Sequence, residues 1–167
     1  PISLADPEDY PLLLLDDADA ETQMFHRETD RLGFTTLRYS QHYAGLEVWP
    51  SQLGVHLDRN GDVIMVDGAY VPTPRGVQTT PTLTAREAET KARVSVPAGT
   101  SGKATDPELI LYAPFDQRVR LGWKIGLSVG LAHDWLMVID AIDGKMLKQV
   151  NRCMCVNVPG SGTDLSG

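Results

Sequence analysis

The sequence contains no apolar run long enough to cross a bilayer, which takes roughly 18 residues. The run Leu12–Leu15, for example, ends at Asp16. Basic residues are also scarce, with 15 Lys and Arg against 22 Asp and Glu and a formal net charge of −7. Because neutralising phosphate groups requires a basic face, this balance argues against nucleic acid as a partner and, for the same reason, against an anionic membrane surface.

Cysteine is nearly absent, with Cys153 and Cys155 as the two thiols of the chain. A C-x-C pair is too cramped for an easy disulfide and supplies only half of a zinc site. The four histidines show neither an H-x-x-x-H spacing nor an accompanying acidic helix; they are His26, His42, His56 and His133. We therefore expect no metal site in this chain and thiols without a catalytic role.

The length and composition are those of a folded domain. The chain has 167 residues, 42% hydrophobic and 22% charged, enough for one ordinary domain or two small ones. No positive stretch followed by an apolar one opens the sequence, so we expect any secretion signal to have been removed or never to have existed. Residues 1–21 are poorly patterned and are interpreted as an irregular lead-in.

Two hairpins are predicted in the first half. Thr22–Thr29 and Phe34–Tyr43 flank a turn that ends at Gly33, and the second of these segments alternates apolar and polar side chains, with Ser40 on the polar face. A second hairpin joins Val55–Asp58 to Val63–Val66 through Asn60-Gly61, a strong hairpin signal. Both segments therefore indicate half-buried strands.

The second half begins after a stretch rich in proline. Thr84 and Glu87 fit a capping box, and a short alanine-striped helix should follow and end before Pro97. Four strands are then predicted, at residues 108–113, 119–129, 135–142 and 145–151, the last two joined by a turn at Asp143-Gly144. The tail beyond them is rich in Gly and Ser.

These patterns predict an α+β chain built from antiparallel sheets. We expect two small subdomains at residues 22–72 and 83–152, joined by a Pro-rich linker at 73–82 and followed by an extended C-terminal segment at 153–167. Each subdomain should hold a sheet with few helices.

One catalytic motif matches in form. Gly126–Gly130 reads G-x-S-x-G around Ser128, with His133 and Asp134 nearby. A nucleophile elbow needs a sharp strand-to-helix turn, whereas this pentapeptide continues an alternating strand that leads to another strand. We therefore expect Ser128 on a polar strand face and no catalytic residue in the chain.

A ligand groove lined by tryptophan is the other candidate site. Trp49, Trp123 and Trp135 could form one, but Trp123 falls on the inward stripe of its strand, which favours core packing. The chemistry of the residues alone thus indicates a binding or accessory module without catalytic equipment.

The segment from Leu37 to Pro72 resembles the fungalysin/thermolysin propeptide motif, in which a strand R-[YF]-x-Q-x-Y-x-G-x-x-V leads to a V-H-x-D-x-x-G-x-V hairpin. The matching residues are Arg38, Tyr39, Gln41, Tyr43, Gly45, Val48, His56, Asp58 and Gly61. The order of parts after the linker, a T-A-x-E-A helix, an E-L-x-x-Y strand, a W-x-x-x-L strand and a D-A-x-x-G-K hairpin, resembles a PepSY domain.

This resemblance implies two cystatin-like subdomains and the function of a zymogen propeptide. Such a chain would act as intramolecular chaperone and inhibitor of a secreted, thermolysin-like zinc metallopeptidase, its cognate catalytic domain being the partner. The zinc, the calcium and the H-E-x-x-H helix would belong to that domain, so this chain would hold no cofactor. The alternative is a free-standing secreted module or protease inhibitor of PepSY type.

The end of the chain is similar to the junction at which the mature peptidase begins in thermolysin-like precursors. Peptidases of this type favour a bulky apolar residue after the scissile bond, so an autoprocessing precursor would pass this region through its own cleft. The expected inhibitory and cleavage segment comprises Asn151, Arg152, Met154, Val156, Asn157 and Val158. The alternative is that this segment is a solvated linker without an inhibitory role.

Overall fold

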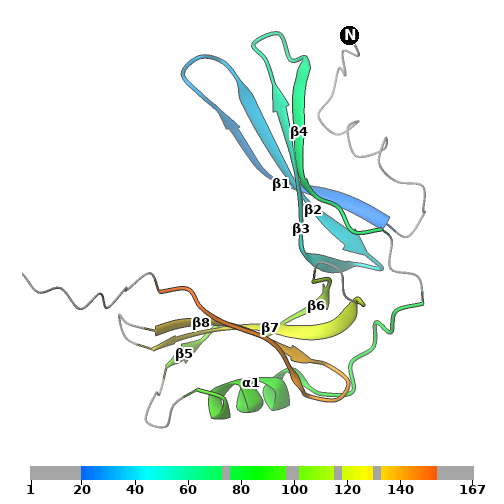
Figure 1. The fold of residues 1–167 in the computed structure, drawn as a ribbon, viewed down its shortest axis with the longest axis vertical. Coiled ribbons are helices and arrows are strands. Elements are labelled where there is room, and N and C mark those ends of the chain that lie inside the picture. Colours follow the sequence, from blue (N-terminus) through cyan, green and yellow to red (C-terminus); the bar gives the residue numbers. More distant parts are fainter. Residues whose placement is uncertain (1–19, 73–75, 97–101, 115–117, 130–132, 154–167) are drawn as a thin grey trace, which may run out of the picture.

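The computed structural model describes residues 20–72, 76–96, 102–114, 118–129 and 133–153. Within these ranges, nine strands and one α-helix follow one another along the chain (Figure 1). The elements are β1 (Ala20–Thr29), β2 (Thr35–Tyr43), β3 (Leu46–Leu57), β4 (Val63–Ala69), α1 (Ala85–Val94), β5 (Lys103–Ala104), β6 (Glu108–Tyr112), β7 (Arg120–Val129), β8 (His133–Asp140) and β9 (Met146–Asn151).

The strands form two antiparallel sets, as the alternation and the turns predict. β1 to β4 pair in sequence order, and so do β6 to β9, with the two-residue β5 added to β7. Helix α1 covers the lower side of the β6–β9 set (Figure 1). The expected α+β architecture, mostly sheet with a short helix, is confirmed.

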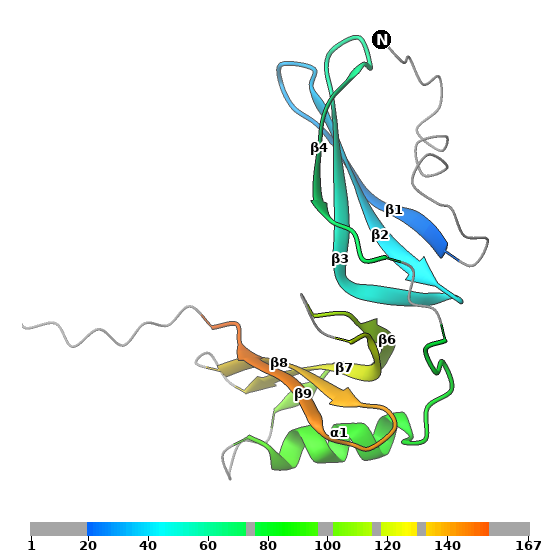
Figure 2. The same cartoon turned by 45° about the vertical axis from the view of Figure 1, so that its right-hand side comes forward.

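The structure differs from two separate antiparallel sheets at one place. β3 begins earlier than the sequence indicates, and its first residues pair with β6 in parallel, with Glu47 opposite Ile110 and Trp49 opposite Tyr112. β3 then bends upward and pairs with β4 (Figure 2). The result is a single mixed sheet, because a bent strand can satisfy its backbone groups in both sets.

Helix α1 starts and packs as its sequence predicts. The Glu87 backbone N–H donates to Thr84 Oγ1 at 3.3 Å, and Glu87 Oε2 accepts from the Thr84 backbone N–H at 2.8 Å, which completes the capping box. Ala88 and Ala92 are buried against Ile125 and Met137 of the sheet. Small residues on this stripe let the helix approach the strands closely.

Separate clusters of buried residues pack against the upper strands and against the region where β3 meets β6. Leu37, Tyr39, Val55 and Leu57 form the cluster of the upper strands, and Val48 joins Leu111, Leu121 and Ala141 where β3 meets β6. Ser40, expected on the polar face, is also buried, next to a register shift between Ser40 and His42. No helix in the described part of the chain has the length and apolar character needed to span a membrane.

Candidate functional site

The nine motif residues all lie on the β2–β3 region and on the hairpin that follows it. Tyr39 is buried in the cluster of the upper strands, and Val48 is buried in the cluster where β3 meets β6. Arg38 is exposed. Tyr43 packs beside Val48 in the cluster under β3. Structure thus gives most of this motif a scaffolding role, which the resemblance alone does not define.

The side-chain amide of Gln41 takes the place of a strand partner for Val71, in the segment that follows β4. Its side chain is 1% exposed, and its Nε2 donates to the Val71 carbonyl oxygen at 2.7 Å. Its Oε1 accepts from the Val71 backbone N–H at 3.0 Å and lies 2.8 Å from Ser51 Oγ. One side-chain amide therefore satisfies both backbone groups of Val71 and fixes the exit of the β3–β4 hairpin.

Gly45 belongs to the tight turn between β2 and β3. Ala44 has φ +49° and Gly45 has φ +76°, so both central residues of the turn are in the left-handed region. A two-residue hairpin loop of this kind matches the twist of its strands, and glycine adopts it without strain. Gly45 is therefore required by the turn, and Ala44 is strained there.

The same aspartate-centred turn closes two of the three hairpins of β1–β4, the β1–β2 and the β3–β4 hairpin. Asp58 Oδ1 accepts from the backbone N–H groups of Asn60 at 2.8 Å and of Asp62 at 3.0 Å, and Gly61 has φ +87°. Backbone hydrogen bonds from Asp62 and Asn60 hold the pKa of the Asp58 carboxyl below its ordinary value. Asp30 makes the equivalent contacts in the β1–β2 turn.

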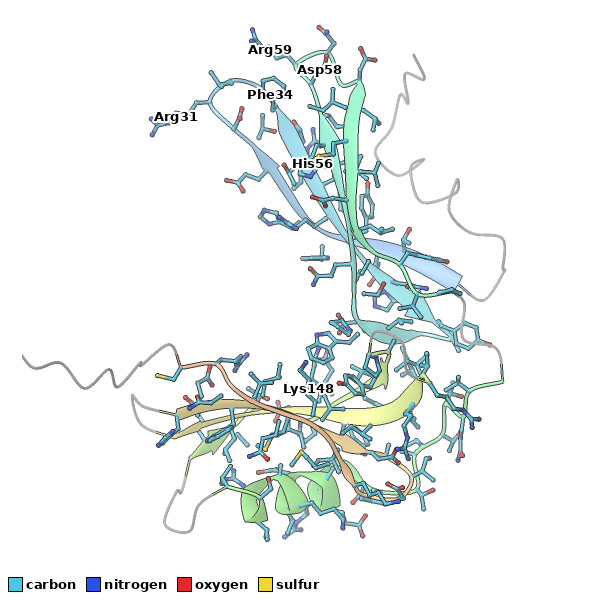
Figure 3. The ribbon with its side chains drawn as sticks, viewed as in Figure 1. Arg31, Phe34, His56, Asp58, Arg59 and Lys148 are labelled. Atoms are coloured by element: carbon cyan, nitrogen blue, oxygen red, sulfur yellow. The ribbon has the colours of Figure 1, made fainter. Side chains whose placement is uncertain are left out.

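The two hairpin tips contact each other, as Figure 3 shows for the labelled residues Phe34 and Arg59. The Arg59 guanidinium carbon lies 5.9 Å from the centre of the Phe34 ring. Lower on the same hairpin, His56 Nδ1 lies 3.1 Å from Thr36 Oγ1, and His56 Nε2 lies 3.3 Å from Asp67 Oδ2. Each of these contacts fixes the shape of the upper sheet.

The start of the expected junction segment is fastened to β8. Asn151 Oδ1 accepts from the backbone N–H groups of Asp134 at 3.1 Å and of Cys153 at 3.0 Å. Arg152 pairs with the Asp134 carboxylate at 3.0 Å. The remaining candidates, Met154, Val156, Asn157 and Val158, lie outside the described residues. The described part therefore fixes where the tail leaves the fold.

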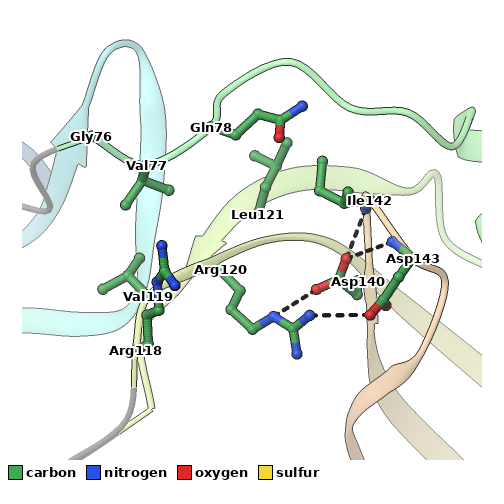
Figure 4. A pocket seen from close by; sticks show the side chains of 10 residues that line it. All are labelled: Gly76, Val77, Gln78, Arg118, Val119, Arg120, Leu121, Asp140, Ile142 and Asp143. Atoms are coloured by element: carbon green, nitrogen blue, oxygen red, sulfur yellow. Dashed lines mark hydrogen bonds and ion pairs between the residues drawn. The ribbon is translucent and has the colours of Figure 1, made fainter.

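A half-open pocket of about 620 Å³ lies beside the start of β7 and the β8–β9 turn (Figure 4). Arg120 Nε pairs with the buried Asp140 at 2.8 Å, and its Nη2 lies 3.3 Å from Asp143 Oδ2. Hydrogen bonds and charge from Lys145, together with Arg120, lower the pKa of Asp143 to about 2. Arg120 pairs with both carboxylates of the pocket, so these charges stabilise the fold.

Ser128 occupies a regular strand position. The β7–β8 register places it opposite Asp134, and β5 places Lys103 on its other side. It lacks the strand-to-helix turn of a nucleophile elbow, because β8 follows β7. In the part of the chain that the structure describes, no group of three or more His, Cys, Asp or Glu side chains is placed to hold a metal ion.

An unexpected cluster joins the two strand sets. Trp49 stacks on Tyr112 with 5.9 Å between ring centres, and Lys124 Nζ pairs with Glu47 at 2.8 Å and with Glu108 at 2.9 Å. Burial opposes the charge of Lys124, but the hydrogen bonds to the two carboxylates outweigh it and raise its pKa. Lys148 Nζ lies 5.5 Å from the centre of the Trp49 ring.

Sequence reasoning missed this cluster. The alternation places Lys124 on the outward, polar face of its strand, but only the fold shows that Glu47 of β3 lies 2.8 Å from its Nζ. Trp123, in contrast, packs in the core as expected and donates from Nε1 to the Leu83 carbonyl oxygen at 2.9 Å.

Comparison with known proteins supports the resemblance to thermolysin-like precursors. Residues 23–70 match the Fungalysin/Thermolysin Propeptide Motif. The chain is 29% identical over 153 residues to thermolysin of Alicyclobacillus acidocaldarius subsp. acidocaldarius, covering 84% of this chain and 27% of that protein. It is 28% identical over 154 residues to a thermostable neutral protease of Geobacillus stearothermophilus, with the same coverage of 84% and 27%. It is also 27% identical over 161 residues to bacillolysin of Bacillus subtilis, covering 90% and 31%.

The chain thus spans about a quarter to a third of the length of the relatives that it matches. None of these matches tests the PepSY likeness of residues 83–152, which stays a prediction. The predicted resemblance is confirmed: residues 23–70 match the fungalysin/thermolysin propeptide motif, and most of the chain is similar to part of thermolysins and bacillolysins.

Proposed function

We propose that this chain is the propeptide of a secreted, thermolysin-like zinc metallopeptidase zymogen, which it helps to fold and then inhibits. The observation that carries the proposal is the match to the thermolysins along 84% of the chain, with the propeptide motif inside it. The zinc and calcium then belong to the peptidase domain, which is the partner of this chain. No catalytic residue is required here.

The proposal assigns the inhibitory contact to the segment that leaves β9. Asn151 and Arg152 are fastened to β8, so the following residues start from a fixed point. A segment held at one end loses less conformational freedom when it enters a cleft. We expect residues 151–158 to lie in or near the peptidase cleft, in the manner of a product, after autoprocessing.

The second half is proposed to be a PepSY-like subdomain at residues 83–152, and both halves to be cystatin-like. In support, a helix lies across an antiparallel set of strands in the second half. The first half, at residues 22–72, is an antiparallel set without a helix among its described residues. The assigned linker, 73–82, connects them.

The chaperone role follows from size and topology. A catalytic region of more than about 150 residues is expected to meet kinetic traps when it folds. A rigid domain that presents a preformed surface lowers that barrier if it binds the transition state at least as well as the native state. The contacts of Trp49 with Tyr112 and of Lys124 with Glu47 support such rigidity, because they link one strand set to the other.

The test uses the peptidase region of the same precursor, prepared separately. The full chain should inhibit it, and deletion of Cys153–Gly167 should weaken inhibition by roughly tenfold or more while the circular dichroism melt stays unchanged. Denatured peptidase should recover activity after dilution only when the folded chain is present and is then digested.

Two outcomes would contradict the proposal. Equal inhibition by the truncated chain would place the inhibitory contact elsewhere. If the chain neither inhibits the peptidase nor assists its refolding, the result would favour the alternative, a free-standing secreted binding module or protease inhibitor.

A further inference from the structure

Strand β4 carries an apolar surface that the described part of the fold leaves exposed. Its four consecutive apolar residues are 39%, 56%, 50% and 54% exposed, in the order Val63, Ile64, Met65 and Val66. Because successive side chains of a strand point to opposite faces, both faces of β4 are apolar and open. In the part of the chain that the structure describes, β4 pairs only with β3, so its outer edge is free.

Strands β1 and β9, at the two ends of the strand order, carry charged and polar residues. β1 includes His26, Arg27 and Glu28, and β9 includes Lys148 and Gln149. Charged and long polar side chains on an edge strand discourage pairing with another chain. The run Val63–Val66 has no such residue and no proline, so nothing local blocks the addition of a strand to this edge.

We propose that Val63–Val66 is a docking edge, on which an extended segment of the peptidase region of the same precursor pairs as an added strand. This inference rests on the proposed function. The matched part is 27% of thermolysin, so most of that relative lies outside it. In the proposed precursor the peptidase region is tethered to this chain. Tethering raises the effective concentration of the segment, so a modest contact area suffices.

The charges at the ends of the edge define the chemistry of the occupant. Asp62 precedes the apolar run and Asp67 follows it. Asp67 is held in place by His56 Nε2 at 3.3 Å, and its side chain remains 52% exposed. Its carboxylate also lies against Gly54, where a Cβ atom would collide with it. The edge therefore fits an apolar strand with a basic residue on each flank.

The same charges disfavour a second copy of this chain. Antiparallel pairing of two Val63–Val66 runs about their centres would bring Asp62 of one copy opposite Asp67 of the other, at both ends. Like charges directly opposite are destabilising in an antiparallel pair. The net charge of −7 adds a general repulsion.

The test compares the full chain with Ile64→Lys and, separately, Val66→Lys, against the separately prepared peptidase domain. Both positions are at least half exposed, so neither substitution should lower the melting temperature appreciably. The matched control is Val94→Lys on α1, where the side chain is 81% exposed. We expect binding to weaken about tenfold or more for the β4 variants and to stay unchanged for the control.

A second readout separates strand pairing from side-chain contact. Amide hydrogen exchange of residues 63–67 should slow when the wild-type chain binds the peptidase. Wild-type binding together with unchanged affinity of both β4 variants, or with unprotected amides, overturns the docking edge and leaves the proposed function intact. Absence of wild-type binding overturns both. A wild-type dimer that Ile64→Lys dissociates in sedimentation would assign the edge to a second copy instead.

Discussion

Replacing Gln41 by leucine tests whether a single buried amide holds the β3–β4 hairpin. The substitution keeps side-chain bulk but removes the donor to the Val71 carbonyl oxygen at 2.7 Å and the acceptor for the Val71 N–H at 3.0 Å. Ser51 keeps a partner, because its hydroxyl also lies 2.6 Å from the Ala69 carbonyl oxygen. Two backbone groups of Val71 therefore lose their partner.

The expected loss follows from those two groups. A buried polar group left without a partner costs about 1–3 kcal/mol. Val71 is only partly buried, so water can reach it and the lower part of the range applies. We expect Gln41→Leu to reduce the free energy of unfolding by about 2–3 kcal/mol, which is a large share of the roughly 5–15 kcal/mol typical of a domain.

Urea denaturation followed by circular dichroism measures this loss. Gln52→Leu is the matched control, because Gln52 is an exposed glutamine on β3 and should change stability by less than about 0.5 kcal/mol. Amide exchange at Val71 should accelerate only in the Gln41 variant. A loss below about 0.5 kcal/mol for Gln41→Leu would refute the idea that this amide supports the hairpin.

Three further predictions follow from local geometry and charge. Ala44→Gly should raise the free energy of unfolding by about 0.5–1 kcal/mol in a thermal melt, because Ala44 has φ +49°; no gain would contradict the strain. Lys124, with a pKa raised above 10.5, should stabilise the fold at all pH values below 10.5 and lose that contribution as pH rises through the raised pKa; Lys124→Met should lack this alkaline loss in urea midpoints. Asp143, with a pKa of about 2 against an ordinary 3.8, should stabilise the fold above pH 3.8 and stop doing so as pH falls through about 2; Asp143→Asn should show no such acid step, and an NMR titration near 3.8 would contradict the assignment.

Features encoded within a few residues could be predicted from the sequence. The Asn60-Gly61 turn, the Asp143-Gly144 turn and the Thr84 cap appear as expected, because each depends on hydrogen bonds between near neighbours. Gly61 and Gly144 both adopt positive φ, at +87° and +73°. The alternation on β7 also predicted that Trp123 would face inward, where it packs against the core.

Features that depend on distant parts of the chain could not be predicted. Alternation shows which face of β3 is inward, but not that Glu47–Trp49 would pair with residues 110–112. The role of Gln41 had a signal, an amide on an otherwise apolar face, yet its partner Val71 is 30 residues away. The motif residues were identified by resemblance, and only their contacts reveal what each one does.

The hairpin turns and the β4 edge differ in whether their exposed backbone groups find partners within the described chain. At the turns, Asp30, Asp58 and Asp140 each accept two backbone N–H groups, so the exposed backbone of a loop is satisfied within the chain. On β4, the outer backbone edge of an apolar strand has no strand partner among the described residues. Among the described outer strands, β4 departs from this pattern because it combines an open edge with four consecutive exposed apolar side chains. Such departures are expected where a partner supplies the missing contacts. A propeptide that must first bind its peptidase and later separate from it would carry that kind of surface on an edge, where contacts can form and break without unfolding the sheet.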